Sequence, residues 1–424
     1  LIQGALWDPD AGLVIPRSQV VSGEMIRDAE ETGKLVTMPN TSATALDIEN
    51  GRIKGVETER GYIATSHVVV CAGLWGRLIA EMAGEDLPVM PVDHPLTFFG
   101  PYTQFEGTGL EIGYPLLRDQ GNSAYLRDTG DPKTAEGGQI EWGYYEEKEP
   151  RLVHPRDLLE KEQARLSPSQ RDLDMEQIIE PLERAMELTP ILGELGYKDK
   201  WSFNGLLQVT ADGGPSIGES PDVRGLWYGV SVWVKDGPGT GKVIADWMTD
   251  GRTELDHHSI DYARYYPIQK SETYIADRCY ETAFKIYNPP VHNREPYSKG
   301  RNLRSAPFNL REKELGGYFM ELAGWERAHG YAANEETLLA KYADRVPVRE
   351  NEWDNRHFWR VSNAEHLELS ENVGMVNLSH FAIYDVSGRD AAQLMEYVSS
   401  SKVAGDTAVG KGVYTNFLDA VGGV

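Results

Sequence analysis

Hydrophobic positions recur with two different periods in the first part of the chain. Between residues 17 and 32 the apolar side chains are spaced as on one face of a helix, and Gly33 follows as a stop signal. Residues 43–48, 53–58 and 62–65 have the composition of strands, and short turns containing Gly51 and Gly61 separate them. The pattern therefore predicts a helix followed by a three-stranded antiparallel meander.

A continuous apolar run, HVVVCAGLWG at residues 67–76, follows the meander. Strands that read as apolar throughout are typical of strands buried on both faces. The strand ends in Ala72 and Gly73, where the backbone can approach a ligand closely. Small residues at a strand end more often serve packing, but the neighbouring meander favours a ligand contact here.

The rest of the chain changes character several times. Residues 91–150 alternate strand-like runs with polar loops, residues 155–195 are mainly helical, and residues 205–220 predict a hairpin through a turn at 211–215. Tyr, Arg, Asn and Pro are frequent at 260–312, which indicates a connecting region. From about residue 351 the pattern predicts a compact α+β unit, with apolar runs at 373–379 and 381–388, a helix at 389–399 and a further run at 413–418.

A strand, a glycine-rich turn and a helix are predicted at residues 229–248, GVSVWVKDGPGTGKVIADWM. The segment is not a P-loop, because Asp236 stands where the first glycine belongs and Val243 replaces the hydroxyl residue. It is not a dinucleotide fingerprint either, because Lys242 occupies the third glycine position. Such a turn directs N–H groups and a helix dipole at a phosphate or at the edge of a flavin ring, with Thr240 as the expected N-cap. A plain glycine turn is the structural alternative.

Composition narrows the classes of function. The 424 residues carry a formal net charge of −24, which argues against nucleic acid and against an anionic membrane surface. No apolar run is long enough to span a bilayer. The two cysteines, Cys71 and Cys279, form no metal or redox motif, which suits the cytoplasm, or the mitochondrial matrix in a eukaryote. His257 and His258 fit a solvated loop better than a metal site, so no metal is expected.

Nine short motifs, in order along the chain, resemble the family of dimethylglycine and sarcosine dehydrogenases and oxidases. They are VVVCAGLWG (68–76), PVDH (91–94), PLLRD (115–119), YLR (125–127), FNG (203–205), DGGPSIGE (212–219), RNLR (301–304), KELG (313–316) and GWER (324–327). The resemblance implies a mixed α/β and α+β fold. Residues 1–252 would form an FAD-binding domain of the glutathione-reductase and D-amino-acid-oxidase type, with an antiparallel substrate sheet at about 91–210. A central connecting domain would follow at 253–350, and residues 351–424 would begin a folate-binding domain similar to the glycine-cleavage T-protein.

The resemblance also implies the functional residues. His94 and Tyr125 match the family's catalytic pair, and an intrinsic pKa near neutrality would let His94 control amine protonation. The flavin ring is expected against Val232, Trp233, Val234, Lys235, Gly237, Gly239 and Thr240, and the adenosine half of FAD against Ala43, Ala72 and Gly73. Tyr414 matches a residue near the folate pterin, or is an ordinary strand aromatic. Asn377 stands where such folate domains usually place Asp.

The implied activity is oxidative demethylation of an N-methyl amino acid of the dimethylglycine or sarcosine type. Hydride would pass to the flavin, and the one-carbon unit would go to tetrahydrofolate or leave as formaldehyde, with oxygen or an electron-transfer flavoprotein as the acceptor. Arg118 and Arg127 are candidates for the substrate carboxylate. The family's dinucleotide-binding βαβ unit is expected before residue 1, and further folate-site residues after residue 424. Two alternatives stay open: a folate-dependent aminomethyltransferase with a non-catalytic flavin-like scaffold, and an inert structural piece.

Overall fold

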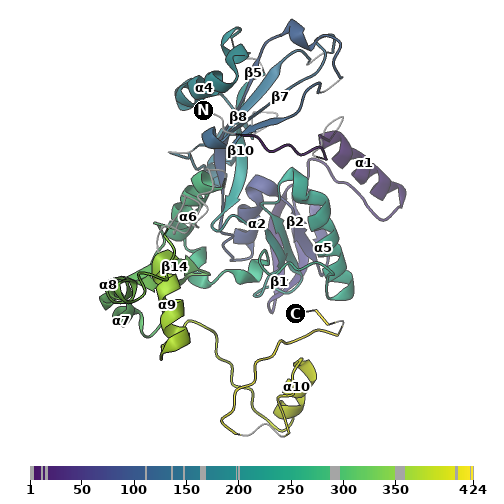
Figure 1. Cartoon of the computed structure of the whole chain (residues 1–424). Helices are drawn as coiled ribbons and strands as arrows, with labels where there is room; N and C mark the ends of the chain where they lie inside the picture. Colours follow the sequence, from purple (N-terminus) through teal and green to yellow (C-terminus); the bar gives the residue numbers. More distant parts are fainter. Residues whose placement is uncertain are drawn as a thin grey trace.

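Four β-sheets organise the chain in the computed structural model (Figure 1). The structure describes residues 4–10, 13–14, 18–109, 112–134, 137–146, 149–162, 169–196, 198, 201–286, 297–348, 359–405, 409–420 and 422–423. Short 3-10 turns connect many of its elements: η1 (Gly73–Trp75), η2 (Thr103–Phe105), η3 (Gln120–Asn122), η4 (Pro190–Gly193), η5 (Val234–Asp236), η6 (Tyr262–Arg264) and η7 (Pro267–Lys270). Among the described residues, no helix is both long and apolar enough to cross a bilayer.

The first elements match the prediction from the sequence. Helix α1 (Ser18–Glu31) precedes the antiparallel meander of β1 (Ala43–Glu49), β2 (Arg52–Thr58) and β3 (Gly61–Ala64). The Tyr62 side chain lies across Gly55 of β2, where a Cβ would lie 2.3 Å from its ring. The apolar face of α1 differs from the expectation. None of its described side chains is buried, so the helical period is present without the packing that usually accompanies it.

A three-stranded sheet carries the strand of the glycine-rich segment. Its order is β11 (Ser216–Glu219), β12 (Leu226–Val230) and β4 (Val68–Val70), with β4 parallel to β12. One face of β12 packs with Ala80 of α2 (Gly76–Met82), and the other face packs with α5 (Gly237–Asp250). The expectation that β4 is buried on both faces is wrong. It forms the edge of the sheet within the described residues, and Val69 is 39% exposed.

The largest sheet is antiparallel, as the substrate sheet at 91–210 was expected to be. Its order is β6 (Leu117–Asp119), β7 (Ala124–Asp128), β8 (Ile140–Tyr144), β5 (Val89–Phe99), β10 (Phe203–Thr210) and β9 (Gln170–Arg171). Helix α3 (Pro155–Glu162) and helix α4 (Met175–Leu188) come from the region predicted to be helical. The buried side of α4, with Ile178 and Leu182, packs with Trp142 and closes one face of this sheet. The other face packs in part with helix α6 (Glu272–Lys285), at β5 and β10.

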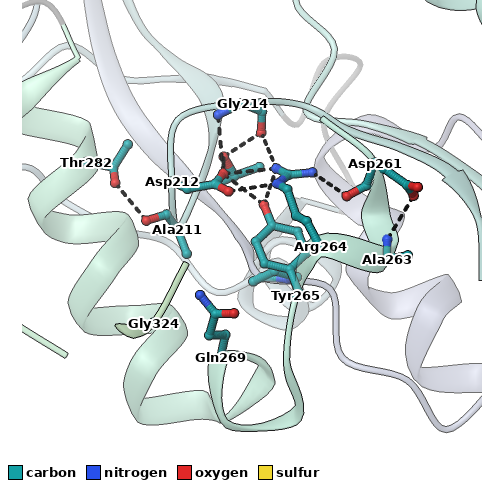
Figure 2. Close-up of polar contacts among 12 residues, drawn as sticks. Ala211, Asp212, Gly214, Asp261, Ala263, Arg264, Tyr265, Gln269, Thr282 and Gly324 are labelled. Carbon is teal, nitrogen blue, oxygen red and sulfur yellow. Dashed lines mark hydrogen bonds and ion pairs between the residues drawn. The ribbon is translucent and has the colours of Figure 1, made fainter. Parts of the chain in front are cut away.

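The hairpin expected at 205–220 is not formed. Strand β10 belongs to the six-stranded sheet, and β11 belongs to the sheet that it forms with β12 and β4. The turn at 211–215 therefore passes from one sheet to the other. Arg264 fixes this turn from a distant part of the chain: its Nε lies 2.7 Å from Asp212 Oδ2 and one terminal nitrogen lies 3.0 Å from the Gly214 carbonyl oxygen (Figure 2). Burial alone would raise the pKa of Asp212, but the Arg264 hydrogen bonds and charge outweigh it and lower that pKa.

The fourth sheet among the described residues follows helix α6 (Glu272–Lys285). Its order is β13 (Arg304–Ser305), β15 (Trp325–Tyr331) and β14 (Gly317–Leu322), and α7 (Asn309–Glu314) precedes it. Helices α8 (Ala332–Lys341) and α9 (Trp359–Glu371) pack against each other, with Tyr342, Val346 and Ala364 in their shared core. The domain border expected between residues 350 and 351 therefore falls between two helices that share a core.

The compact α+β unit expected from about residue 351 is only partly present. Phe358, part of that pattern, lies outside the described residues. Helix α10 (Ala391–Val398) forms as predicted, and an isolated bridge joins Ser399 to Phe417. The apolar runs at 373–379 and 381–388 are extended but form no strands, and Met375 is 98% and Ile383 86% exposed (Figure 1). Apolar runs form strands where a neighbour buries them, and none of the described residues does so here.

Candidate active site

His94 of β5 and Tyr125 of β7 lie together on the face of the six-stranded sheet that is opposite to α4. The distance from His94 Nε2 to the Tyr125 hydroxyl oxygen is 2.9 Å. Tyr125 stands opposite Gly143 of β8, which stands opposite Leu96 of β5, two residues from His94. Side chains two residues apart on a strand share a face, so the strand register itself brings the pair together.

Gly143 makes room for the tyrosine. A Cβ at this position would lie 2.2 Å from Tyr125 Cζ, so the ring lies across the strand where any other residue would place its side chain. Gly143 was not singled out from the sequence. The sequence signal that could have identified it is a glycine inside a strand, because such a glycine often marks a position that another group approaches closely.

His94 is held neutral. Burial lowers the pKa of His94 to about 4; a hydrogen bond to the Tyr144 backbone opposes this shift, and the positive charge of Arg118 adds to it. The ring also stacks on Tyr145, with 4.5 Å between the ring centroids. The expected pKa near neutrality is therefore wrong, because the sequence did not show how deeply the ring is buried. Nε2 of the neutral His94 ring accepts a hydrogen bond from the Tyr125 hydroxyl group. Burial raises the pKa of Tyr125.

Two adjoining hollows lie beside this pair. The smaller is lined by His94 and Tyr145 together with Val92, Leu207 and Trp233. The larger cleft has a volume of about 670 Å³. Three residues line both hollows: Val209, Trp233 and Ile286. Trp233 is thus a wall between the His94 pocket and the larger cleft.

The residues expected to line a flavin ring divide into two groups. Trp233, Lys235, Gly239 and Thr240 line the larger cleft. Val232, Val234 and Gly237 do not line it, and Val234 is 72% exposed.

Helix α5 begins earlier than expected. It starts at Gly237 with Asp236 at the N-cap position, and Pro238 stands in its first turn, where a fixed φ favours helix initiation. Thr240 lies inside the helix and is buried, so the expectation that it is the N-cap is wrong.

The larger cleft fits the ring end of a flavin. Gly239 lines the cleft and opens onto free space, since a Cβ there would meet no atom within 4 Å. The first turn of α5 contributes N–H groups without a partner inside the helix, and its dipole favours negative charge there. The positive end of a helix beside open, partly apolar space suits a flat ring that becomes anionic on reduction.

The other expected ligand residues lie elsewhere. Gly73 follows β4, and its carbonyl oxygen accepts a hydrogen bond from Gln208 Nε2 at 2.5 Å; Ala72 beside it is half-buried, and Ala43 begins β1. Tyr414 is 95% exposed and lines neither hollow. Asn377 Nδ2 donates to Glu312 Oε1 at 2.9 Å.

The two candidate arginines differ in their contacts. Arg127 forms an ion pair with Glu141 at 2.7 Å, whereas Arg118 lies over the Tyr145 ring, 5.5 Å from its centroid, and its charge affects His94. His257 packs on Trp247, and His258 pairs with Asp256. Within the described part of the chain, no group of three or more His, Cys, Asp or Glu side chains could hold a metal ion.

Three family models match successive parts of the chain. The family model described as FAD dependent oxidoreductase matches residues 1–247, more than half of the chain. The chain belongs to the FAD dependent oxidoreductase family. Two further models match in order: the FAD dependent oxidoreductase central domain at 250–305 and the GCVT N-terminal domain at 308–424. The order expected from the motifs, with a flavin domain, a central domain and the start of a T-protein-like domain, is confirmed.

Curated relatives of this flavoprotein resemble it along nearly its whole length. Mouse mitochondrial sarcosine dehydrogenase is 27% identical and is matched over 100% of this chain and 46% of its own length. The 4-methylaminobutanoate oxidase (formaldehyde-forming) of Paenarthrobacter nicotinovorans is 27% identical over 100% of this chain and 48% of its own. Rat mitochondrial dimethylglycine dehydrogenase is 25% identical over 95% of this chain and 44% of its own. The chain thus spans about half the length of the relatives it matches.

Proposed function

We propose that this flavoprotein oxidatively demethylates an N-methyl amino acid of the sarcosine or dimethylglycine type. The observation that carries the proposal is the neutral His94–Tyr125 pair, 2.9 Å apart. His94 lines a pocket that shares Trp233 with the cleft suited to a flavin ring. Three relatives are named for the oxidation of sarcosine, dimethylglycine and 4-methylaminobutanoate, which are all N-methyl amino acids. The family membership supports the redox class, and the uncharged His94–Tyr125 pair supports an amine substrate.

The site favours an uncharged amine. FAD, when bound, supplies the acceptor for the hydride removed from the N-methyl carbon. The burial and the Arg118 charge that hold His94 neutral also disfavour a second cation, so they lower the pKa of a bound ammonium. Tyr125 donates a hydrogen bond to His94 Nε2, and a lone pair on its hydroxyl oxygen stays available to the substrate. His94 thus orients the tyrosine, and the pair aligns the amine.

Arg118 is the better of the two candidates for the substrate carboxylate. Arg127 already neutralises Glu141, whereas Arg118 carries its charge toward His94 and Tyr145. A charge-assisted contact between a guanidinium and a carboxylate contributes roughly 1.5–3 kcal/mol. The substrate is therefore an amino acid rather than a simple amine.

A substrate panel tests this function. Full-length, flavin-loaded protein is mixed anaerobically with sarcosine, dimethylglycine, 4-methylaminobutanoate and dimethylamine, and flavin absorbance is followed. We expect at least one amino acid to bleach the flavin and dimethylamine to do so poorly. Arg118→Met should weaken amino-acid binding by roughly tenfold or more, and Arg127→Met should do so less. Equal bleaching by dimethylamine, or no bleaching by any of the four, contradicts the proposal.

The remaining assignments extend the same proposal. Ala43, Ala72 and Gly73 would contact the adenosine half of FAD, and Tyr414 would lie near the pterin of a tetrahydrofolate that accepts the one-carbon unit. Oxygen or an electron-transfer flavoprotein would reoxidise the flavin. The match of the GCVT model from residue 308 and the packing of α8 on α9 favour a domain border near residue 306 over one at 351.

A further inference from the structure

Gln208 joins three parts of the molecule that meet at the larger cleft. It lies in β10, is buried, and uses both ends of its side-chain amide. Nε2 donates to the Gly73 carbonyl oxygen at 2.5 Å, and Oε1 accepts from the Ser231 backbone N–H at 3.1 Å. One side chain of the six-stranded sheet therefore holds two loops of the sheet formed by β11, β12 and β4.

The backbone of Gln208 adds a second set of contacts. Its carbonyl oxygen accepts from Trp233 Nε1 at 2.9 Å and from the Ser231 hydroxyl at 3.2 Å. Gln208 stands opposite Pro91 of β5, whose carbonyl oxygen points away from β10 and accepts from the Val153 N–H. The backbone groups of Gln208 therefore point to the side away from β5. On the other side β9 pairs only with Asn204 and Gly205, so this stretch of β10 is an edge within the described residues. The Ser231–Trp233 loop satisfies the edge carbonyl that no strand reaches.

Ser231 is the turning point of that loop. Its φ of 57° lies in the left-handed region, which is uncommon for a residue other than glycine. The Gln208 amide accepts its N–H, and the Gln208 carbonyl accepts its hydroxyl proton. The left-handed conformation is thus held from the neighbouring sheet rather than by the loop itself.

We propose that Gln208 is a positioning residue for the redox site. It holds the Gly73 loop and the Ser231–Trp233 loop against the sheet that carries His94, and so fixes where Trp233 stands between the amine pocket and the larger cleft. The inference rests on the proposed function. A displacement of reacting groups by about 1 Å can lower the rate roughly 10²-fold. The site therefore requires a contact such as Gln208 that keeps the two sheets in a fixed relative position.

The test compares Gln208→Leu with Gln208→Glu in the full-length, flavin-loaded protein. Leucine removes both side-chain hydrogen bonds; glutamate keeps an acceptor for Ser231 N–H but turns a carboxylate toward the Gly73 carbonyl. Gln177→Leu is the matched control, since Gln177 is another buried amide bonded to Asn204 of the same strand. Anaerobic flavin reduction gives the limiting rate and the amine dissociation constant separately, and hydrogen exchange reports on the two loops.

We expect Gln208→Leu to lower the limiting reduction rate by roughly 10²-fold and to leave amine binding near the wild-type value. Amides at 73–76 and 231–236 should exchange faster in this variant, and the glutamate variant should speed exchange at 73–76 more than at 231–236. Wild-type exchange at both loops in Gln208→Leu, or equal losses in Gln177→Leu, overturns the inference. If no amine bleaches the wild type, the proposed function fails, and the exchange data alone decide whether Gln208 holds the loops.

Discussion

Burial of one imidazole gives the site its chemical character. His94 contacts Tyr125 through Nε2 and stacks on Tyr145. Burial and the positive charge of Arg118 disfavour protonation of its ring. The neutral ring is therefore a fixed acceptor rather than a proton donor at neutral pH. The identities of His94 and Tyr125 could be proposed from the sequence through a resemblance. The shifted pKa could not, because it depends on strands far apart in the chain.

This burial predicts how stability varies with pH. The pKa of His94 is about 4 in the folded protein and about 6.5 when unfolded, so the unfolded state binds more protons between these values. Stability should fall as pH drops through this window, with His94 contributing up to about 3 kcal/mol. His94→Asn should flatten the dependence measured by urea unfolding at pH 4.5–7. His258→Asn, which removes an exposed histidine, serves as the control. A slope unchanged by His94→Asn would contradict the buried neutral ring.

Strand register brings His94 and Tyr125 together, and local and distant signals contribute differently to it. The meander of β1 to β3 could be predicted because an Asn-Gly turn is a local signal. The turn at 211–215 has similar local chemistry, yet Arg264, more than fifty residues away, ties it between two sheets. The order of the six-stranded sheet is likewise set by contacts that no short window contains. The approach of the Tyr125 ring to Gly143 follows only from that order of strands.

Gly143→Ala tests the register directly. The added methyl group would meet the Tyr125 ring, so the ring must move away and lose its hydrogen bond to His94. We expect kcat/KM for the amine to fall toward the value of Tyr125→Phe, a loss of roughly 10²-fold, while the fold is kept. Gly121→Ala is the matched control, since a Cβ there meets only Asp119, at an ordinary 3.6 Å. A Gly143→Ala enzyme with wild-type kcat/KM would show that Tyr125 does not need its observed position.

Helix α6 connects the flavin side of the molecule to the small sheet of β13, β14 and β15. Cys279 and Ala283 of α6 pack under the substrate sheet, and Ala283 also lines the His94 pocket. Arg278, on the same helix, is buried and lies 2.7 Å from Glu321 Oε2 of β14. The sequence indicated only a connecting region at 260–312, so this helix was not predicted. The partner of Arg278 could not be predicted, because many acidic residues in the sequence were equally available.

The Arg278–Glu321 pair should contribute strongly to the stability of this junction. Glu321→Leu leaves a buried guanidinium without its counter-charge, so the unfolding free energy should fall by about 3 kcal/mol. Glu314→Leu breaks the exposed pair with Arg311 and should cost less than about 1 kcal/mol. Denaturant unfolding of the full-length variants measures both values. Equal costs for the two substitutions would mean that the junction does not depend on the buried pair.

Oxidation at an N-methyl carbon is the central claim, and isotopic substitution tests it most directly. Full-length, flavin-loaded protein is mixed anaerobically with sarcosine or dimethylglycine, each with ordinary and with fully deuterated N-methyl groups. We expect flavin bleaching, and slower bleaching with the deuterated methyl groups, because the C–H bond broken belongs to that carbon. A colourless full-length protein, or bleaching at the same rate with both isotopes, would contradict the account.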